Sequence, residues 1–161
     1  MDAYSRIAVP MILGRFPEWE PFARLDSRAD GAGNTVDFNI PCPSGAAESG
    51  LWISTADEEF SVGFHTHHCH FTDYESRNNP IQIEAGLKYA ADIIDERLGV
   101  VSWYRAGCFV GSFSVELPYP APLPGLFDDA RDAQLVAMFS NCDRATLRSW
   151  LGHFDRDEVR S

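Results

Sequence analysis

Alternation of hydrophobic and polar residues predicts the first strands of this chain. Residues 36–40 read Val-Asp-Phe-Asn-Ile, a period-two pattern that Pro41 and Pro43 interrupt. Two further strand-like segments, residues 51–55 and 60–71, flank the acidic turn Asp57-Glu58-Glu59. We expect these two segments to form an antiparallel hairpin, because strand-forming residues lie on both sides of a short polar connection.

Helical spacing of apolar residues replaces this alternation after residue 79. Asn79 can cap a helix that begins at Pro80, and Gly99 supplies a stop. The apolar positions recur in steps of three or four and are Ile83, Leu87, Ala90, Ile94 and Leu98. This pattern predicts a helix over residues 80–98 that packs on a sheet through one face, with an acidic solvent face that includes Asp92, Asp95 and Glu96.

A second hairpin and a helical tail are expected after this helix. Residues 100–105 and 108–117 are joined by Ala106-Gly107, and one alternating face of the second strand carries Phe109, Phe113, Val115 and Leu117. Four prolines make residues 118–125 a stiff connector. Residues 128–139 predict one helix, and Asp143 can cap another with an apolar stripe of Leu147, Trp150, Leu151 and Phe154.

These elements together predict an α+β fold. We expect residues 1–161 to form a single domain with an antiparallel sheet of about five strands, one main helix packed on it, and helical C-terminal segments. The expected parts are an irregular lead-in at 1–35, a sheet–helix–sheet core at 36–117, the proline-rich connector at 118–125 and a helical tail at 126–161.

Charge narrows the range of partners. The chain has 24 acidic and 13 basic residues, which gives a net charge of −11. Direct binding to nucleic acid or to an anionic membrane is therefore disfavoured, and a basic partner is favoured. Many proteins are acidic merely for solubility, so the charge constrains association without identifying a function.

Cysteine spacing and the N-terminal sequence indicate a cytoplasmic protein without a cofactor. The four cysteines have long spacings and lack a C-x-x-C pair, so we interpret Cys42, Cys69, Cys108 and Cys142 as free thiols. The apolar stretch at residues 7–13 is short, carries Pro10 and lacks a basic leader. We therefore expect neither secretion nor membrane insertion.

Four of the five histidines lie within six positions. In one regular strand over residues 60–71, His68 and His70 share a face with Phe60, and His65 and His67 share the other. His68 and His70 can then be core-side groups bonded to their neighbours, while His65 and His67 meet solvent or a partner.

A metal-dependent enzyme is the alternative. His68-Cys69-His70 followed by Glu75 resembles the first metal motif of the cupins, which implies an ion held by His68, His70 and Glu75. The second cupin motif, with its late histidine, is missing, because the fifth histidine, His153, falls in the predicted C-terminal helix. No serine has the strand–turn–helix context of a hydrolase nucleophile.

The central part of the chain, residues 36–117, resembles small bacterial immunity proteins of polymorphic toxin systems. The resemblance rests on Leu51-Trp52-Ile53-Ser54-Thr55, on Phe60-Ser61-Val62-Gly63-Phe64 and on His68-Cys69-His70-Phe71, followed by a helix and the Ser102-Trp103-Tyr104 hairpin. It implies a cytoplasmic binder, not an enzyme, that occludes the active site of a cognate toxin, such as a basic nuclease or deaminase. The candidate contact residues are Asp57, Glu58, Glu59, His65, His67, Asp92, Asp95 and Glu96.

Overall fold

The computed structural model describes residues 1–27, 34–43, 50–72, 79–123 and 141–160. The chain divides into two compact units. The first contains Met1–Phe64 and His68–Ala91, and the second contains His65–His67 and Asp92–Ser161. Each unit is described by itself below, and the single domain expected from the sequence stays a prediction.

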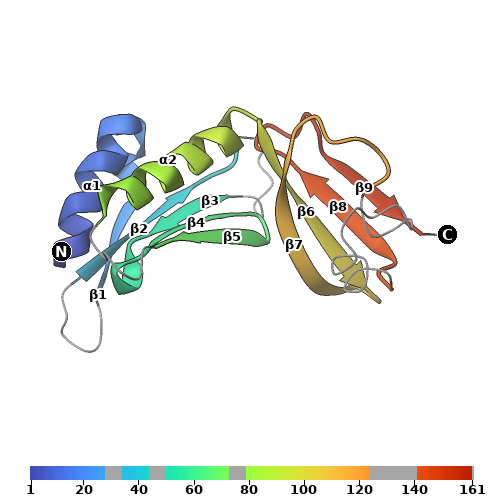
Figure 1. The fold of residues 1–161 in the computed structure, drawn as a ribbon, viewed down its shortest axis with the longest axis horizontal. Coiled ribbons are helices and arrows are strands. Elements are labelled where there is room, and N and C mark those ends of the chain that lie inside the picture. Colours follow the sequence, from blue (N-terminus) through green and yellow to red (C-terminus); the bar gives the residue numbers. More distant parts are fainter. Residues whose placement is uncertain (28–33, 44–49, 73–78, 124–140, 161) are drawn as a thin grey trace. The chain divides into compact units, whose positions relative to one another are not determined.

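The first unit is built on a five-stranded sheet with the order β1-β2-β3-β4-β5. Its strands are β1 (Ala23–Ser27), β2 (Asn34–Ile40), β3 (Leu51–Ser54), β4 (Phe60–Phe64) and β5 (His67–Phe71). Helices α1 (Ala3–Arg15) and α2 (Pro80–Ile94) lie on one face of this sheet (Figure 1). The predicted α+β class and the strand at residues 36–40 are confirmed.

Cross-strand pairing builds the core of the first unit. Phe38 of β2 lies opposite Ile53 of β3, and Ile53 lies opposite Val62 of β4. All three side chains are fully buried, and the side chains of Ile83 and Leu87 in α2 are at most 1% exposed. The predicted apolar stripe of the helix is therefore confirmed where it covers the sheet.

The helix ends earlier than its periodicity indicated. We expected residues 80–98, but α2 ends at Ile94, and Leu98 and Gly99 begin strand β6. Glu96 has a φ of 52°, a left-handed conformation that an α-helix does not tolerate. Ile94 and Leu98 are half-buried on either side of this turn, so the spacing of apolar residues continues past the end of the helix. Spacing alone could therefore not locate that end.

The lead-in predicted to be irregular contains two helical segments. Asp2 caps α1, because its carboxylate accepts a hydrogen bond from the backbone N–H of Ser5 at 2.7 Å. A 3₁₀ segment, η1 (Pro17–Phe22), follows and buries Trp19 against the stacked ring of Phe16. Pro10 inside α1 masked the helix in the sequence, since proline usually interrupts one.

The histidine-rich run is two strands rather than one. His65 has a φ of 54°, and the chain turns at His65 and Thr66 between β4 and β5. The predicted grouping of Phe60 with His68 and His70 on one face is therefore wrong. Glycine usually occupies a left-handed turn position, and its absence here left no turn signal in the sequence.

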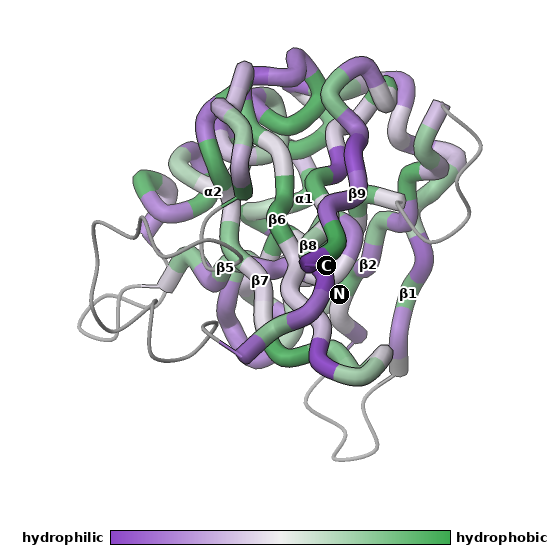
Figure 2. The backbone as a smooth tube through the Cα atoms, turned by 90° about the vertical axis from the view of Figure 1, so that its right-hand side faces the viewer, coloured by the Kyte–Doolittle hydropathy of each residue, from purple (hydrophilic) through white to green (hydrophobic). Residues whose placement is uncertain are grey.

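A four-stranded antiparallel sheet forms the second unit, in the order β7-β6-β8-β9. Its strands are β6 (Leu98–Arg105), β7 (Cys108–Glu116), β8 (Arg144–Arg148) and β9 (Arg156–Val159). The predicted hairpin of residues 100–117 is thus present, but in this second sheet. Hydrophilic residues run along the outer strands β1 and β9 (Figure 2), a composition that disfavours edge-to-edge pairing.

The C-terminal helix predicted from Asp143 is wrong. Residues 144–148 pair with β6 in register Val101↔Leu147 and Trp103↔Ala145, so they form a strand with Ala145, Thr146 and Leu147 buried. Arg144 and Arg148 each form an ion pair with the Asp157 carboxylate of β9, with nitrogen–oxygen distances of 2.9 and 2.6 Å. These ion pairs stabilise the pairing of β8 with β9. The helix predicted at 128–139 lies outside the described residues, and the described part of the connector, 118–123, contains neither helix nor strand.

A β-bulge changes which residues of β7 face the second core. The register shifts between Trp103 and Tyr104 of the opposite strand. Val110, Phe113 and Leu117 therefore pack on the buried cluster of Trp103, Val115 and Leu147, whereas Phe109 is 50% exposed. The predicted face of β7 is correct except at Phe109, where the bulge reverses the alternation.

Close approach of α2 to the first sheet depends on Gly86. A Cβ atom at this position would lie 2.3 Å from Cδ1 of Phe60, whose ring is fully buried in the core. A methyl group here would displace either the ring or the helix, and overpacking of this kind costs about 1–3 kcal/mol.

We expect Gly86→Ala to lower the free energy of unfolding by about 1–3 kcal/mol, measured by urea denaturation. Gly14→Ala in α1 is the matched control, because its Cβ meets no atom within 4 Å. That substitution should be neutral or stabilise by up to about 1 kcal/mol through helix propensity. Equal stabilisation by both substitutions would show that the helix does not rest on Phe60.

Candidate protein-binding face

The acidic turn between β3 and β4 has a strained backbone. Residues Ala56–Glu58 form a short 3₁₀ segment, η2, in which Asp57 and Glu58 have φ values of 59° each. Both side chains belong to exposed residues. Left-handed conformation costs an L-residue roughly 1–2 kcal/mol, and such strain concentrates where a side chain serves a function.

Glu59 has a different role from its two neighbours. Its carboxylate lies 3.1 Å from Nδ1 of His70, and Oγ of Ser61 lies 2.9 Å from the same nitrogen. The pKa of Tyr4 is raised to about 12 by burial and, secondarily, by the negative charge of Glu59. Glu59 is therefore held by the fold and fixes His70 on the surface of β5.

Trp52 connects the histidines of β5 to the neighbouring strands. It lies opposite Gly63 of β4, where a Cβ atom would stand 2.1 Å from its indole ring. The ring centroid of Trp52 is 5.9 Å from that of His68, which in turn is 4.8 Å from that of His70. A row of three rings therefore extends from Trp52 on β3, past Gly63 on β4, to His68 and His70 on β5.

These rings lie on the face of the sheet opposite to α2. Phe60 contacts α2, so the alternating residues Glu59, Ser61 and Gly63 point the other way. On β2 the same alternation, set against buried Phe38, places Asp37 and Asn39 on that face. We call this surface the Trp52 face, which comprises Asp37, Asn39, Trp52, Glu59, His68 and His70.

His65 and His67 belong to the second unit. Oγ of Ser112 lies 3.3 Å from Nδ1 of His67 and donates a hydrogen bond to the carbonyl of Thr66 at 3.0 Å. A hydroxyl that donates to a backbone carbonyl is a structural anchor for this turn rather than an activated nucleophile. Both histidines are half-buried within this unit.

The predicted acidic helix face is occupied by contacts within the protein. Arg97 pairs with Asp92 at 2.7 Å and with Asp95 at 2.8 Å. The Glu96 carboxylate accepts hydrogen bonds from the Leu151 N–H at 2.9 Å and from His153 at 2.6 Å. These three acids therefore stabilise the second unit, which weakens the expectation that they contact a partner.

The metal alternative gains no support from the described residues. Glu75 falls outside them, and within them no group of three or more His, Cys, Asp or Glu side chains could hold an ion. His68 and His70 meet edge to face at an interplanar angle of 90°, with Nδ1 of His70 already placed between Glu59 and Ser61. None of the four cysteines forms a disulfide, as expected.

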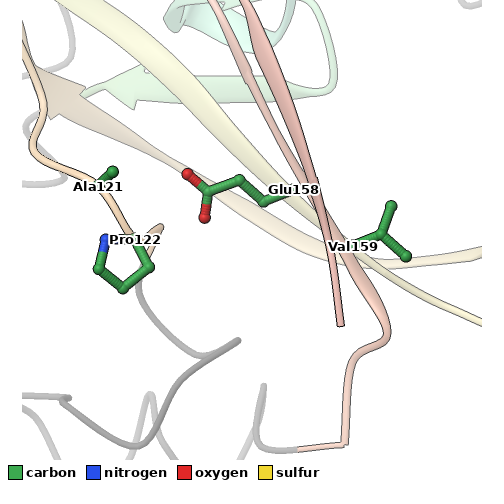
Figure 3. A pocket seen from close by; sticks show the side chains of 4 residues that line it. All are labelled: Ala121, Pro122, Glu158 and Val159. Atoms are coloured by element: carbon green, nitrogen blue, oxygen red, sulfur yellow. The ribbon is translucent and has the colours of Figure 1, made fainter. Parts of the chain in front are cut away.

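A hollow of about 440 Å³ in the second unit is lined by Ala121, Pro122, Glu158 and Val159 (Figure 3). Among its described lining residues Glu158 carries the charge, and this carboxylate is already engaged, because it accepts a hydrogen bond from the Leu123 N–H at 2.7 Å and lies 3.3 Å from the Arg156 guanidinium. The hollow therefore offers little specific recognition for a ligand.

Comparisons with protein-family models, curated protein sequences and solved structures find no match to this chain. Within the described residues, no helix is long and apolar enough to cross a membrane. Assignment of a function therefore rests on the geometry of the chain itself.

The sequence did not identify Trp52 or Asp37 as site residues. Trp52 was interpreted only as part of a strand, because its proximity to His68 depends on the turn at His65. Gly63 within the predicted strand was a usable signal, since a glycine within a strand often marks the close approach of another group.

We expect Glu96→Gln to reduce the acid sensitivity of the second unit. Burial opposes ionisation of Glu96, but hydrogen bonds from Ser149, Leu151 and His153 outweigh it and lower its pKa below the ordinary 4.5. A lowered folded-state pKa gives stability that is present above pH 4.5 and is lost as the pH falls through the folded value. The substitution should cost about 1–3 kcal/mol at pH 7 and much less at pH 3, measured by urea unfolding.

Glu84→Gln is the matched control for this experiment. Its side chain is 60% exposed and its nearest ion pair, with Arg15, spans 4.0 Å. An unchanged pH dependence in Glu96→Gln, equal to that of Glu84→Gln, would contradict the assigned role of Glu96.

Proposed function

We propose that this protein is an immunity protein that neutralises a cognate toxin by stoichiometric binding, without catalysing a reaction. The observation that carries the proposal is the pair of exposed acids, Asp57 and Glu58, held in consecutive left-handed conformations. Strained backbone persists where the surrounding structure enforces it, and here it carries two exposed carboxylates in the loop that leads into β4.

The net charge of −11 supports the same proposal. An acidic surface accelerates association with a basic protein and opposes binding to nucleic acid, so it suits an inhibitor that competes for a basic active site. A basic nuclease or deaminase has such a site, because it must hold a polyanionic substrate. The toxin is therefore expected to bind through the surface that it otherwise presents to nucleic acid, and protection is expected in the cytoplasm.

The test combines capture with neutralisation. Tagged protein should capture one stoichiometric partner from a lysate of its own organism, and this partner should dissociate at high salt. The partner expressed alone should stop the growth of a host cell, and co-expression of this chain should restore it. A captured partner that is harmless, or whose toxicity persists on co-expression, would contradict the proposal.

We expect the double substitution Asp57→Asn and Glu58→Gln to slow association with the partner by about tenfold at low salt. Biosensor kinetics at two salt concentrations measure this effect. The matched control is Glu18→Gln with Glu20→Gln, which removes the same charge from exposed positions in η1. An equal loss in both variants would assign the effect to net charge rather than to the acidic turn.

A further inference from the structure

The Trp52 face combines an aromatic ring with carboxylates at defined positions. Asn39 lies opposite Trp52, and Asp37 lies opposite Ser54, in the pairing of β2 with β3. Asp37 is thus the diagonal neighbour of Trp52, a relation that separates Cβ atoms by about 7–8 Å. One extended side chain of a partner can reach both groups from above the sheet.

The indole of Trp52 is held flat by the strand beside it. Any side chain at Gly63 would overlap the ring, so the ring rests directly on the backbone of β4. One side of the ring is consequently packed on the protein, and the residue as a whole is half-buried, so part of the indole is accessible. An accessible indole attracts a planar cation, and tryptophan is the strongest aromatic partner for one.

Asp37 lacks a hydrogen-bond donor at one oxygen. Its Oδ1 is buried, and none of the described residues donates to it. Arg24, its cross-strand neighbour on β1, directs Nη1 to the carbonyls of Pro21 and Ala23 instead. This buried oxygen is out of reach of a partner, and it adds to the cost of keeping the carboxylate ionised. Asp37 as a whole is half-buried, so a donor from a partner would meet the accessible part of its carboxylate and offset that cost.

Charge selects the chemistry of the occupant. Asp37 and Glu59 lie on the face, Asp57 and Glu58 lie in the loop that leads into β4, and the exposed Arg24 lies opposite Asp37 on the same face. The acids outnumber this cation, so the surface favours a basic side chain. Arginine satisfies all these features together, because its planar guanidinium stacks on an indole and donates in a fork to a carboxylate. Lysine offers a point charge without the planar stacking surface.

We propose that the Trp52 face receives an arginine side chain of a basic protein partner, with the guanidinium stacked on Trp52 and donating to Asp37. This inference rests on the proposed binding function and names the part of the chain that performs it. His68 and His70 border the site, and Glu59 holds the His70 ring through its contact at 3.1 Å.

The test uses a capped Gly-Arg-Arg-Gly peptide as the probe and the full chain. Titration should shift the indole N–H signal of Trp52 in ¹⁵N–¹H NMR spectra, assigned by its loss in Trp52→Leu, and should leave the other indole signals in place. Asp37→Asn, which preserves shape, should raise the dissociation constant about tenfold, whereas Glu18→Gln should not change it. The same peptide with citrulline in place of arginine is tested against the unaltered protein. Its dissociation constant should be at least as high as that of the arginine peptide for Asp37→Asn.

Three results would overturn the proposal. The first is an unshifted Trp52 signal, and the second is an equal shift with the citrulline peptide, which would show that charge plays no part. A shift that follows protein concentration without peptide would instead identify a second copy of the chain as the occupant.

The captured toxin separates this proposal from the proposed function. If Asp37→Asn and Trp52→Leu bind the toxin as tightly as the unaltered protein, the Trp52 face is the wrong surface and neutralisation still stands. If the peptide binds at Trp52 but no captured partner is toxic, the face is correct and the immunity function fails.

Discussion

The packing of α2 on the first sheet is the constraint on which the rest of the first unit depends. Gly86 lets the helix approach the ring of Phe60, and this contact commits Phe60, Val62 and Phe64 to the core. Since side chains alternate along a strand, Ser61 and Gly63 then point to the opposite face. The Trp52 face is thus a consequence of how the core is packed.

The turn at His65 is the second determinant of this surface. It folds the histidine-rich run back on itself, so that His68 and His70 come beside Trp52 and Ser61. Had the run been one strand, those imidazoles would have pointed with Phe60 towards the helix. One left-handed residue therefore changes the two histidines from core groups to surface groups.

Much of the fold follows from hydrophobic periodicity in the sequence. The strand at 36–40, the helix that begins at Pro80 and the hairpin around Ala106-Gly107 were predicted because apolar residues recur there with clear periods. The tail was not, because Leu147, Trp150, Leu151 and Phe154 fit a helical stripe, whereas pairing with β6 and the contacts of Arg144 and Arg148 with Asp157 favour strands. Such long-range pairing has no local signature.

The candidate site was predicted only in part, for a similar reason. The acidic turn was identified from its composition, but its left-handed backbone was not, since neither Asp57 nor Glu58 is a glycine. Asp92, Asp95 and Glu96 were expected to face a partner, and their contacts with Arg97, Leu151 and His153 arise from residues that are adjacent only after folding. Composition shows that acids are present, and only the folded structure shows the contacts that Asp92, Asp95 and Glu96 make within the second unit.

The most direct test of this account is carbethoxylation of histidines, read by mass spectrometry, in the free protein and in its complex with the captured toxin. The account predicts that His68 and His70 become protected in the complex. His153, whose side chain is 68% exposed in the second unit, should react equally in both states. Equal modification of His68 and His70 with and without the toxin would contradict the claim that the Trp52 face is the binding surface.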